Sequence, residues 1–335
     1  MTTTFYQLIL WRYYAPLVTL SLLVLNVLCG YIFMPDSSTT PEQYRDIGAA
    51  LAFPVISGFC FLFLPILGRK AQASILQSAR LSGSSMRHAI VYAQHVNRVP
   101  RLSFRFAAIA GATLAISYMA LEDLLYASHI DMLGNLKRLP LFLESIYFFV
   151  AVILLITSLV RITVLLTRFA TRGMRIELFH IEELVPLADA VLWNTISISM
   201  TMALAPIFWL GRTIPSLDIS LVTAVLAVTL YLLFFPLFKV RYIVSQRKQL
   251  ALERIRDALK SATKSDDLLK RRLTDSAKRL EEINNLVGVR EEITRTKEWP
   301  ITVPVGIRVA LFVLIPPVSW ASASIVDWVV LQIVS

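Results

Sequence analysis

Seven runs of about 20 predominantly apolar residues restrict what this chain can fold into. An α-helix rises 1.5 Å per residue, so each run is long enough to cross a hydrocarbon layer of about 30 Å. The 335 residues are 56% hydrophobic and only 17% charged, against about 25% charged in an average soluble domain. The runs are residues 15–34, 47–67, 106–125, 142–160, 190–210, 219–238 and 309–328. The sequence therefore predicts an all-α, polytopic helical membrane protein with about seven transmembrane helices.

The basic residues predict how these helices are oriented. Residues 68–105 contain seven Lys and Arg residues and no acid. Because cytoplasmic loops carry such an excess, we expect this loop, residues 161–189 and residues 239–299 on the cytoplasmic side. The N-terminus then lies in the cytoplasm and the C-terminus outside. The net charge of +10 is explained by the excess of Lys and Arg that cytoplasmic loops carry in a protein of the inner (plasma) membrane.

Charged residues also mark the ends of the runs. Arg12 and Asp36 flank the first run, and Glu144 and Arg161 flank the fourth. A base stands at the inner end and an acid at the outer end in every run except the fifth, where Arg212 is outermost. Such side chains can reach an interface, so no ionisable group is expected at mid-membrane. Coupled transporters usually need one there, which argues against coupled transport of a charged solute.

The last run contains features that an ordinary apolar helix lacks. Pro316 and Pro317 remove two amide donors, and the carbonyls that they free need partners in protein or in a water-filled cavity. A small polar face follows, formed by Ser319, Ala323 and Asp327 with Ser324 beside it. The same pattern suits a conduction path or a tight helix–helix contact, and the sequence leaves both open.

The fifth run carries a second polar surface. Thr195 and Ser199 share one helical face, and Ser197 and Thr201 share another. These hydroxyls either line a passage or donate to carbonyls of their own helix. We expect the pathway to be lined by Thr195, Ser199, Pro316, Pro317, Ser319, Ser324 and Asp327.

Residues 239–299 predict a cytoplasmic antiparallel helical hairpin. Apolar residues recur every three to four positions on both sides of a turn at residues 263–267, and Pro300 stops the second arm. The hairpin has mixed charges and no aromatic residue between Tyr242 and Trp299, which argues against a nucleic-acid partner. A shorter amphipathic piece around residues 86–96 either lies on the inner leaflet or covers neighbouring spans. The chain thus divides into a transmembrane bundle, residues 1–238 with cytoplasmic loops 68–105 and 161–189, the hairpin, residues 239–299, and a proline-broken transmembrane segment, residues 300–335.

No motif indicates an enzyme or a cofactor. The sequence contains no GxSxG, HExxH, P-loop or GxGxxG pattern. His180 and Glu183 could share a metal ion if they lay on a helix, but a solvated connector is the favoured interpretation. Cys29 and Cys60 lie at different predicted depths, so no disulfide is expected. We therefore expect no catalysis, no metal and no cofactor.

A homo-oligomeric channel or pore is the first functional hypothesis, gated or assembled through the hairpin. Acids near the outer helix ends would make it cation-leaning; they are Asp36, Asp46, Glu122, Glu144, Asp218 and Asp327. Two alternatives stay open. One is a non-transporting scaffold or signalling protein that recruits a cytoplasmic protein through residues 239–299. The other is a transporter of a neutral or lipid-like solute. The lipid bilayer is a partner in all three.

Overall fold

All regular secondary structure in the described part of the chain is helical, as the sequence predicts. The computed structural model describes residues 3–33, 40–121, 139–174, 181–210, 214, 216–263 and 273–295, together with positions 307, 311, 314–315 and 318–320. The α-helices in order are α1 (Thr3–Leu28), α2 (Pro41–Leu81), α3 (Met86–Asn97), α4 (Arg101–Leu121), α5 (Leu139–Arg168), α6 (Val185–Ala203), α7 (Ser216–Thr263) and α8 (Leu273–Arg295). Short turns of π- or 3-10 helix are η1 (Phe169–Gly173), η2 (Ile181–Leu184) and η3 (Ala205–Trp209).

Four helical stretches among the described residues are long and apolar enough to cross a membrane. They are Glu42–Leu81, Met86–Leu121, Leu139–Gly173 and Val185–Trp209. Shorter apolar helices cover Tyr14–Leu28 and Asp218–Val228, where the sequence predicts the first and sixth spans. The chain is thus compatible with a membrane-embedded helical protein. Most of the predicted seventh span lies outside the described residues, so the number seven stays a prediction.

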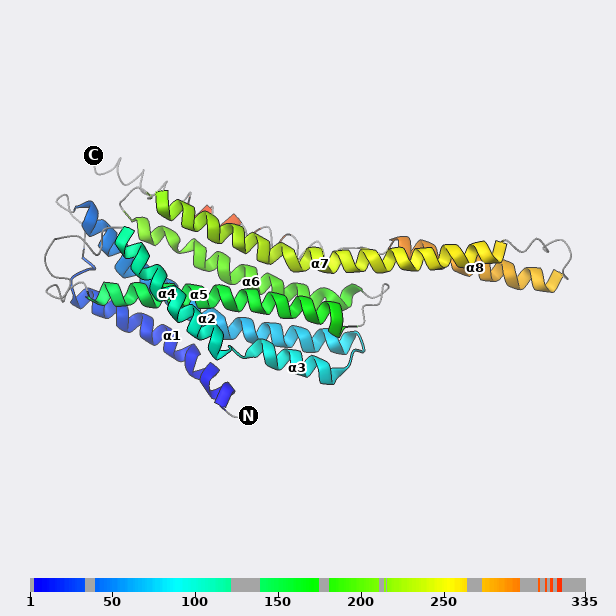
Figure 1. Cartoon of the computed structure of the whole chain (residues 1–335), viewed down its shortest axis with the longest axis horizontal. Helices are drawn as coiled ribbons and strands as arrows, with labels where there is room; N and C mark the ends of the chain where they lie inside the picture. The colour runs from blue at the N-terminus through cyan, green and yellow to red at the C-terminus, as the bar shows by residue number, and fades with distance from the viewer. Residues whose placement is uncertain are drawn as a thin grey trace.

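The connection expected at residues 68–105 is largely helical, and α3 covers the amphipathic piece predicted around residues 86–96. α2 contains 41 residues, about 60 Å or twice a hydrocarbon layer, and continues to Leu81. α3 then packs back against it (Figure 1) after a turn in which Gly83 has φ +58, a backbone conformation that favours glycine. The buried faces that meet are formed by Ala71, Ile75 and Ala79 on α2 and Ala89, Ala93 and Val96 on α3. Arg69 and Lys70 therefore end the apolar run without ending the helix, because their side chains are exposed while small apolar residues continue on the buried face.

The first helix begins and ends earlier than the predicted span 15–34. It starts at Thr3 and ends at Leu28, because Gly30 adopts φ +77 just beyond it. The Tyr31 N–H donates to the Asn26 carbonyl at 2.9 Å, and the Gly30 N–H donates to the Val27 carbonyl at 3.0 Å. These two hydrogen bonds form a Schellman cap, which satisfies the last carbonyls of the helix.

Small residues bring α4 into close contact with α5. The buried residues of α4 are Ala107, Gly111, Ala115 and Met119, spaced every four positions. A Cβ atom at Gly111 would lie 2.7 Å from the Cα and N atoms of Val150. Close backbone approach of this kind is how helices associate in lipid, where burial of apolar side chains gives no driving force.

The C-terminal part of α7 and α8 extend away from the rest of the molecule (Figure 1), whereas the first part of α7 packs on α5 and α6. α7 contains 48 residues, about 72 Å, and runs without a break through residues 238 and 239, where the sequence suggested a domain boundary. α8 lies antiparallel along its end (Figure 1), and Lys248 Nζ donates to the Thr294 carbonyl at 3.0 Å. Ile293 is buried, whereas Leu280 on the same helix is 66% exposed. The predicted turn lies outside the described residues, and the cytoplasmic position of the hairpin stays a prediction.

Candidate functional site

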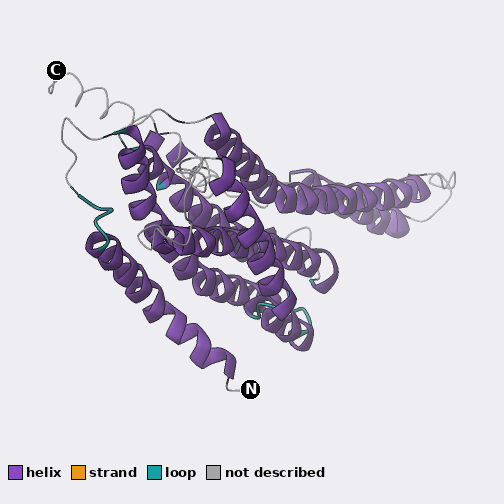
Figure 2. Ribbon diagram, turned by 60° about the vertical axis from the view of Figure 1, so that its left-hand side comes forward, coloured by secondary structure: helices purple, strands orange, loops and turns teal. Residues whose placement is uncertain are grey.

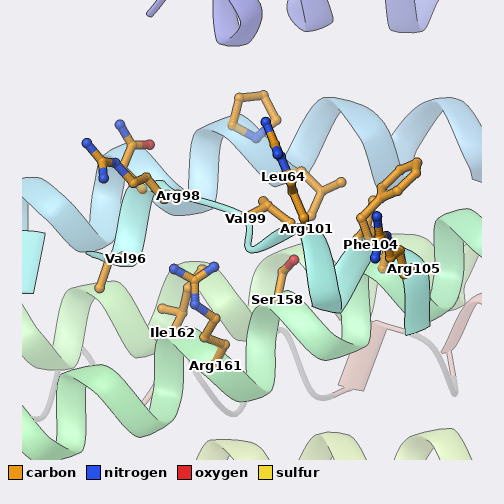
Figure 3. Close-up of a pocket in the computed structure, with 14 residues that line it drawn as sticks. Leu64, Val96, Arg98, Val99, Arg101, Phe104, Arg105, Ser158, Arg161 and Ile162 are labelled. Atoms are coloured by element: carbon orange, nitrogen blue, oxygen red, sulfur yellow. The ribbon is translucent and has the colours of Figure 1, made fainter. Parts of the chain in front are cut away.

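A basic cavity of about 750 Å³ lies between α2, the link from α3 to α4, and α5. Figure 3 shows its residues: Ser158 and Arg161 project from α5 toward the link, and further arginines stand on the link and the first turns of α4. The four arginines are Arg98, Arg101, Arg105 and Arg161, and no carboxylate is among the lining residues. The apolar part of the lining includes Leu64, Val96, Val99, Phe104, Leu154 and Ile162. We call this site the basic cavity.

Pro100 explains why the arginines gather here. Proline has no amide donor and disfavours helical backbone in the residue before it, which is Val99. α3 ends just ahead of this position, at Asn97, and Arg98 is extended, with φ −98 and ψ 124. α4 then starts at Arg101. Arg101 and Arg105 are four residues apart and so share one face of its first turns. The break thus places three arginines within eight residues beside α5.

Arg161 connects the cavity to the end of α3. Its Nη2 atom donates to the carbonyl of His95, which lies in the last turn of α3. A cation there is favoured by the partial negative charge of the helix C-terminus. Guanidinium groups stay protonated at any physiological pH, and none of the four arginines forms an ion pair with a carboxylate of the described residues. The cavity therefore concentrates positive charge that an anion can neutralise.

An apolar cavity of about 290 Å³ adjoins the basic cavity. Its lining comes from α1, α2, α4 and α5 and consists of Tyr14, Ala15, Val18, Phe61, Phe104 and Tyr147. Phe104 lines both cavities, so they are neighbours. Figure 2 shows α1 running alongside the other helices at one edge of the molecule. A ligand with a charged end and an apolar end matches the pair of cavities.

The two predicted pathway residues on α6, Thr195 and Ser199, are buried. Thr195 Oγ1 donates to the Val191 carbonyl of its own helix at 3.1 Å, as the neighbouring Thr201 Oγ1 does to the Ser197 carbonyl at 2.8 Å. A hydroxyl that donates to a carbonyl of its own helix can be buried at little cost in free energy.

The C-terminal segment meets the end of α6. Ser319 Oγ donates to the Ala203 carbonyl at 2.8 Å, and Trp320 Nε1 donates to the Met202 carbonyl at 3.2 Å. These carbonyls lie in the last turn of α6, where the ladder of intrahelical hydrogen bonds ends, so the contact supplies them with side-chain donors. Pro316, Pro317, Ser324 and Asp327 lie outside the described residues. The lining of a pathway by these residues and by α6 stays a prediction.

The weak metal candidates are only partly described. Glu183 lies in η2, and His180 falls outside the described residues. Nowhere in the described ranges do three or more His, Cys, Asp or Glu side chains group in a way that could hold a metal ion. Cys29 and Cys60 are both free thiols.

The structure describes three of the six acids that the sequence places near the outer helix ends. Glu144 and Asp218 are buried, with Glu144 only 2% exposed, and Asp46 pairs with Arg45 at 3.2 Å. The remaining three, Asp36, Glu122 and Asp327, lie outside the described residues. Glu144 is therefore buried inside the bundle instead of exposed at a helix end, and its position relative to a membrane interface stays a prediction.

Asn26 is the functional candidate that the sequence analysis missed. It is fully buried, and its Nδ2 atom donates to Glu144 Oε2 and to the Ala50 carbonyl, both at 2.8 Å. Two sequence signals were available. Asn26 is the only carboxamide in the first apolar run, and apolar residues continue on both sides of Glu144. A charge that ends a span should have polar residues beyond it.

Asp218 is buried in a satisfied cluster. Its Oδ1 atom accepts from the Tyr118 hydroxyl at 3.0 Å, and its Oδ2 atom accepts from Trp209 Nε1 at 2.7 Å. This carboxylate joins α4 and η3 to the first turn of α7. It serves the packing of three elements.

A comparison of the chain with protein-family models, curated proteins and solved structures found no match. The function therefore has to be inferred from the geometry of the chain itself.

Proposed function

We propose that this chain is a multi-pass membrane protein that binds an anionic, lipid-like ligand, and that it moves or presents this ligand without chemical change. The acidic headgroup would lie among the arginines of the basic cavity, and the apolar chain would pass Phe104 toward the apolar cavity. One observation supports this most directly. Four arginines and no carboxylate line a cavity that shares Phe104 with an almost wholly apolar one.

The chemistry of arginine favours such a ligand. A guanidinium donates two parallel hydrogen bonds to a phosphate or carboxylate, and it is less strongly hydrated than an ammonium. If the acid-free stretch 68–105 lies on the cytoplasmic side, as the sequence predicts, the cavity faces the leaflet that carries anionic lipids. The adjoining surface of α4 suits acyl chains, because Leu102, Phe106 and Ile109 are exposed there.

Ligand binding by the purified full-length protein tests the proposal. Retention of phosphatidylglycerol and of phosphatidylcholine would be compared by native mass spectrometry from detergent. We expect preferential retention of phosphatidylglycerol, and Arg101→Gln should weaken it about 10- to 100-fold, since a hydrogen bond to a charged group contributes about 1.5–3 kcal/mol. Arg256→Gln, which removes the same charge from an exposed position on α7, should have no effect. Equal retention of the two lipids, or equal loss in both variants, would contradict the proposal.

A second binding measurement distinguishes a lipid ligand from a soluble anion. Phe104→Ala should weaken phosphatidylglycerol binding and leave the binding of glycerol phosphate unchanged, because only the lipid has a chain that passes this ring. Equal weakening of both ligands would show that the cavity selects a soluble anion.

A homo-oligomeric, cation-leaning channel is the second candidate. The contact of Ser319 with the end of α6 favours it, because it joins the two segments expected to line a path. Ser199→Ala, Ser324→Ala and Asp327→Asn should change single-channel conductance or selectivity in planar bilayers. Unchanged currents in all three would remove this candidate.

Deletion of residues 245–295 distinguishes a channel from a scaffold. A channel should still conduct with altered gating, whereas a scaffold that recruits a partner through the hairpin would lose its function.

A further inference from the structure

The junction of α1, α2 and α5 contains an incomplete hydrogen-bonded pair. Both amide hydrogens of Asn26 are used, since Nδ2 donates to the Ala50 carbonyl and to Glu144 Oε2. The other two oxygens, Asn26 Oδ1 and Glu144 Oε1, are buried and have no donor among the described residues. Both side chains are at least 98% buried. The junction thus has two acceptors and lacks one donor.

We propose that Glu144 is a proton-binding site, in which Oε1 carries an exchangeable proton and Asn26 is the positioning partner. A carboxylic acid and a carboxamide can exchange two hydrogen bonds, because the amide N–H donates to one acid oxygen while the acid O–H donates to the amide oxygen. The first of these bonds is present at 2.8 Å. The two atoms of the second bond are the two that lack a partner. A proton taken from water onto Oε1 supplies the missing donor.

Burial favours the neutral acid over the carboxylate at this place. An ionised carboxylate away from water costs several kcal/mol unless a cation and further hydrogen bonds compensate it. Among the described residues Glu144 has one hydrogen bond and no cation. Leu141, three residues before Glu144 on α5, and Phe53, three residues after Ala50 on α2, belong to one buried apolar cluster. The neutral acid removes the charge and also satisfies both orphan oxygens.

A metal cation fits the junction less well than a proton. Ca²⁺ takes six to eight oxygen ligands and Mg²⁺ takes six, while Asn26 and Glu144 together offer three side-chain oxygens. One of these, Glu144 Oε2, already accepts from the amide, whose N–H hydrogens would repel a cation. The part of the chain that the structure describes brings no group of three His, Cys, Asp or Glu side chains together.

Among the described residues no second titratable group bonds to Glu144. The titratable groups on the packed elements include Cys29 and Tyr31 just after α1, Asp46 on α2, Tyr118 on α4 and Tyr147 on α5. Asp46 pairs with Arg45, and the Tyr118 hydroxyl donates to Asp218. Within the described residues none of them forms a hydrogen bond or ion pair with Glu144. The proposed proton-binding site therefore consists of Asn26 and Glu144 alone.

The consequence of the proposal is a proton-dependent attachment of α1. Asn26 links α1 to α5 through Glu144 and to α2 through the Ala50 carbonyl. Loss of the proton leaves an unpaired carboxylate and two unsatisfied oxygens in the junction, which favours separation of α1 from α5. Because the folded bundle then holds a proton that the separated state releases, its stability falls as the pH rises.

Infrared spectroscopy of the full-length protein in lipid nanodiscs tests this inference. We expect the carbonyl stretching band of a buried neutral carboxylic acid in the wild type and its loss in Glu144→Gln. Glutamine keeps the shape and offers an N–H donor at the position of the acid O–H, so the variant should fold. Glu42→Gln, which alters an exposed acid at the start of α2, should keep the band. Absence of the band in the wild type, or its persistence in Glu144→Gln, would overturn the proposal.

Thermal unfolding separates a proton from a metal ion. The decrease in Tm with rising pH should be present in the wild type and in Glu42→Gln and smaller in Glu144→Gln. Asn26→Leu should keep the acid band but shift its frequency, because the hydrogen bond to Oε2 is lost. If Na⁺ at constant ionic strength stabilises the wild type and not Glu144→Gln, the site holds a cation and the proposal is wrong.

Discussion

Gly111 is the position where a single added methyl group should separate two helices. It lies on the buried face of α4, between Ala107 and Ala115. In Gly111→Ala the new Cβ atom would lie 2.7 Å from the Val150 Cα and N atoms and 2.8 Å from its Cγ2 atom. Two of these three atoms are backbone and cannot change rotamer. The clash is relieved only by movement of α4 or α5.

The size of the effect follows from two opposing contributions. Overpacking of a tight contact costs about 1–3 kcal/mol. The upper part of this range applies because the methyl group clashes with backbone atoms, which cannot move aside by changing rotamer. Alanine is favoured over glycine inside a helix by about 1 kcal/mol, which offsets part of the cost. We expect Gly111→Ala to lower the free energy of unfolding by about 1–2 kcal/mol.

Reversible unfolding in mixed detergent micelles, followed by circular dichroism, measures this difference. Gly288→Ala is the matched control, because it adds the same methyl group to α8 at a position with no atom within 4 Å. It should leave the protein unchanged or slightly more stable. If Gly111→Ala is as stable as Gly288→Ala, the close contact between α4 and α5 is not part of the folded protein.

Two further substitutions test the packing of α7. Asp218→Ala removes the acceptor of both Tyr118 and Trp209 and should cost about 2–4 kcal/mol, since each buried group left unsatisfied costs about 1–3 kcal/mol. Asp218→Asn keeps an acceptor oxygen and should cost less, so equal losses and an unchanged Trp209 fluorescence in both variants would contradict the cluster. Ile293→Ala should speed amide hydrogen exchange in α8, because Ile293 is only 4% exposed. Leu280→Ala, at a largely exposed position of the same helix, should not, and equal acceleration would show that no defined seam exists.

The sequence predicted the helical class because each apolar run has the length that a helix needs to cross a membrane. It failed at the ends of the helices, since a charge ends an apolar run but not a helix. Arg69 and Lys70 are in the interior of α2, and Lys239 is in the interior of α7. The end of α1 was set instead by Gly30, whose positive φ forms the cap.

The candidate sites could be predicted only in part. The acid-free stretch that contains Arg98, Arg101 and Arg105 is visible in the sequence, and Pro100 marks the break between helices. Arg161 is far along the chain, so its place in the same cavity depends on how α5 packs. Asn26 and Glu144 are 118 residues apart, and no local pattern indicates that they meet. Pairs of this kind follow from tertiary packing, which periodicity alone does not predict.

The buried position of Glu144 changes which transport mechanisms are open to the chain. The sequence argued against coupled transport because no ionisable group was expected at mid-membrane. Glu144 is an ionisable group buried inside the bundle, and it stands on α5 roughly 25 Å from Arg161 at 1.5 Å per residue. A rigid helix that contacts a proton at one end and an anionic ligand at the other can couple the two, provided that both sites bias the same change in packing. A passive channel needs neither group. The two proposals made above, although independent in evidence, therefore favour a carrier over a pore.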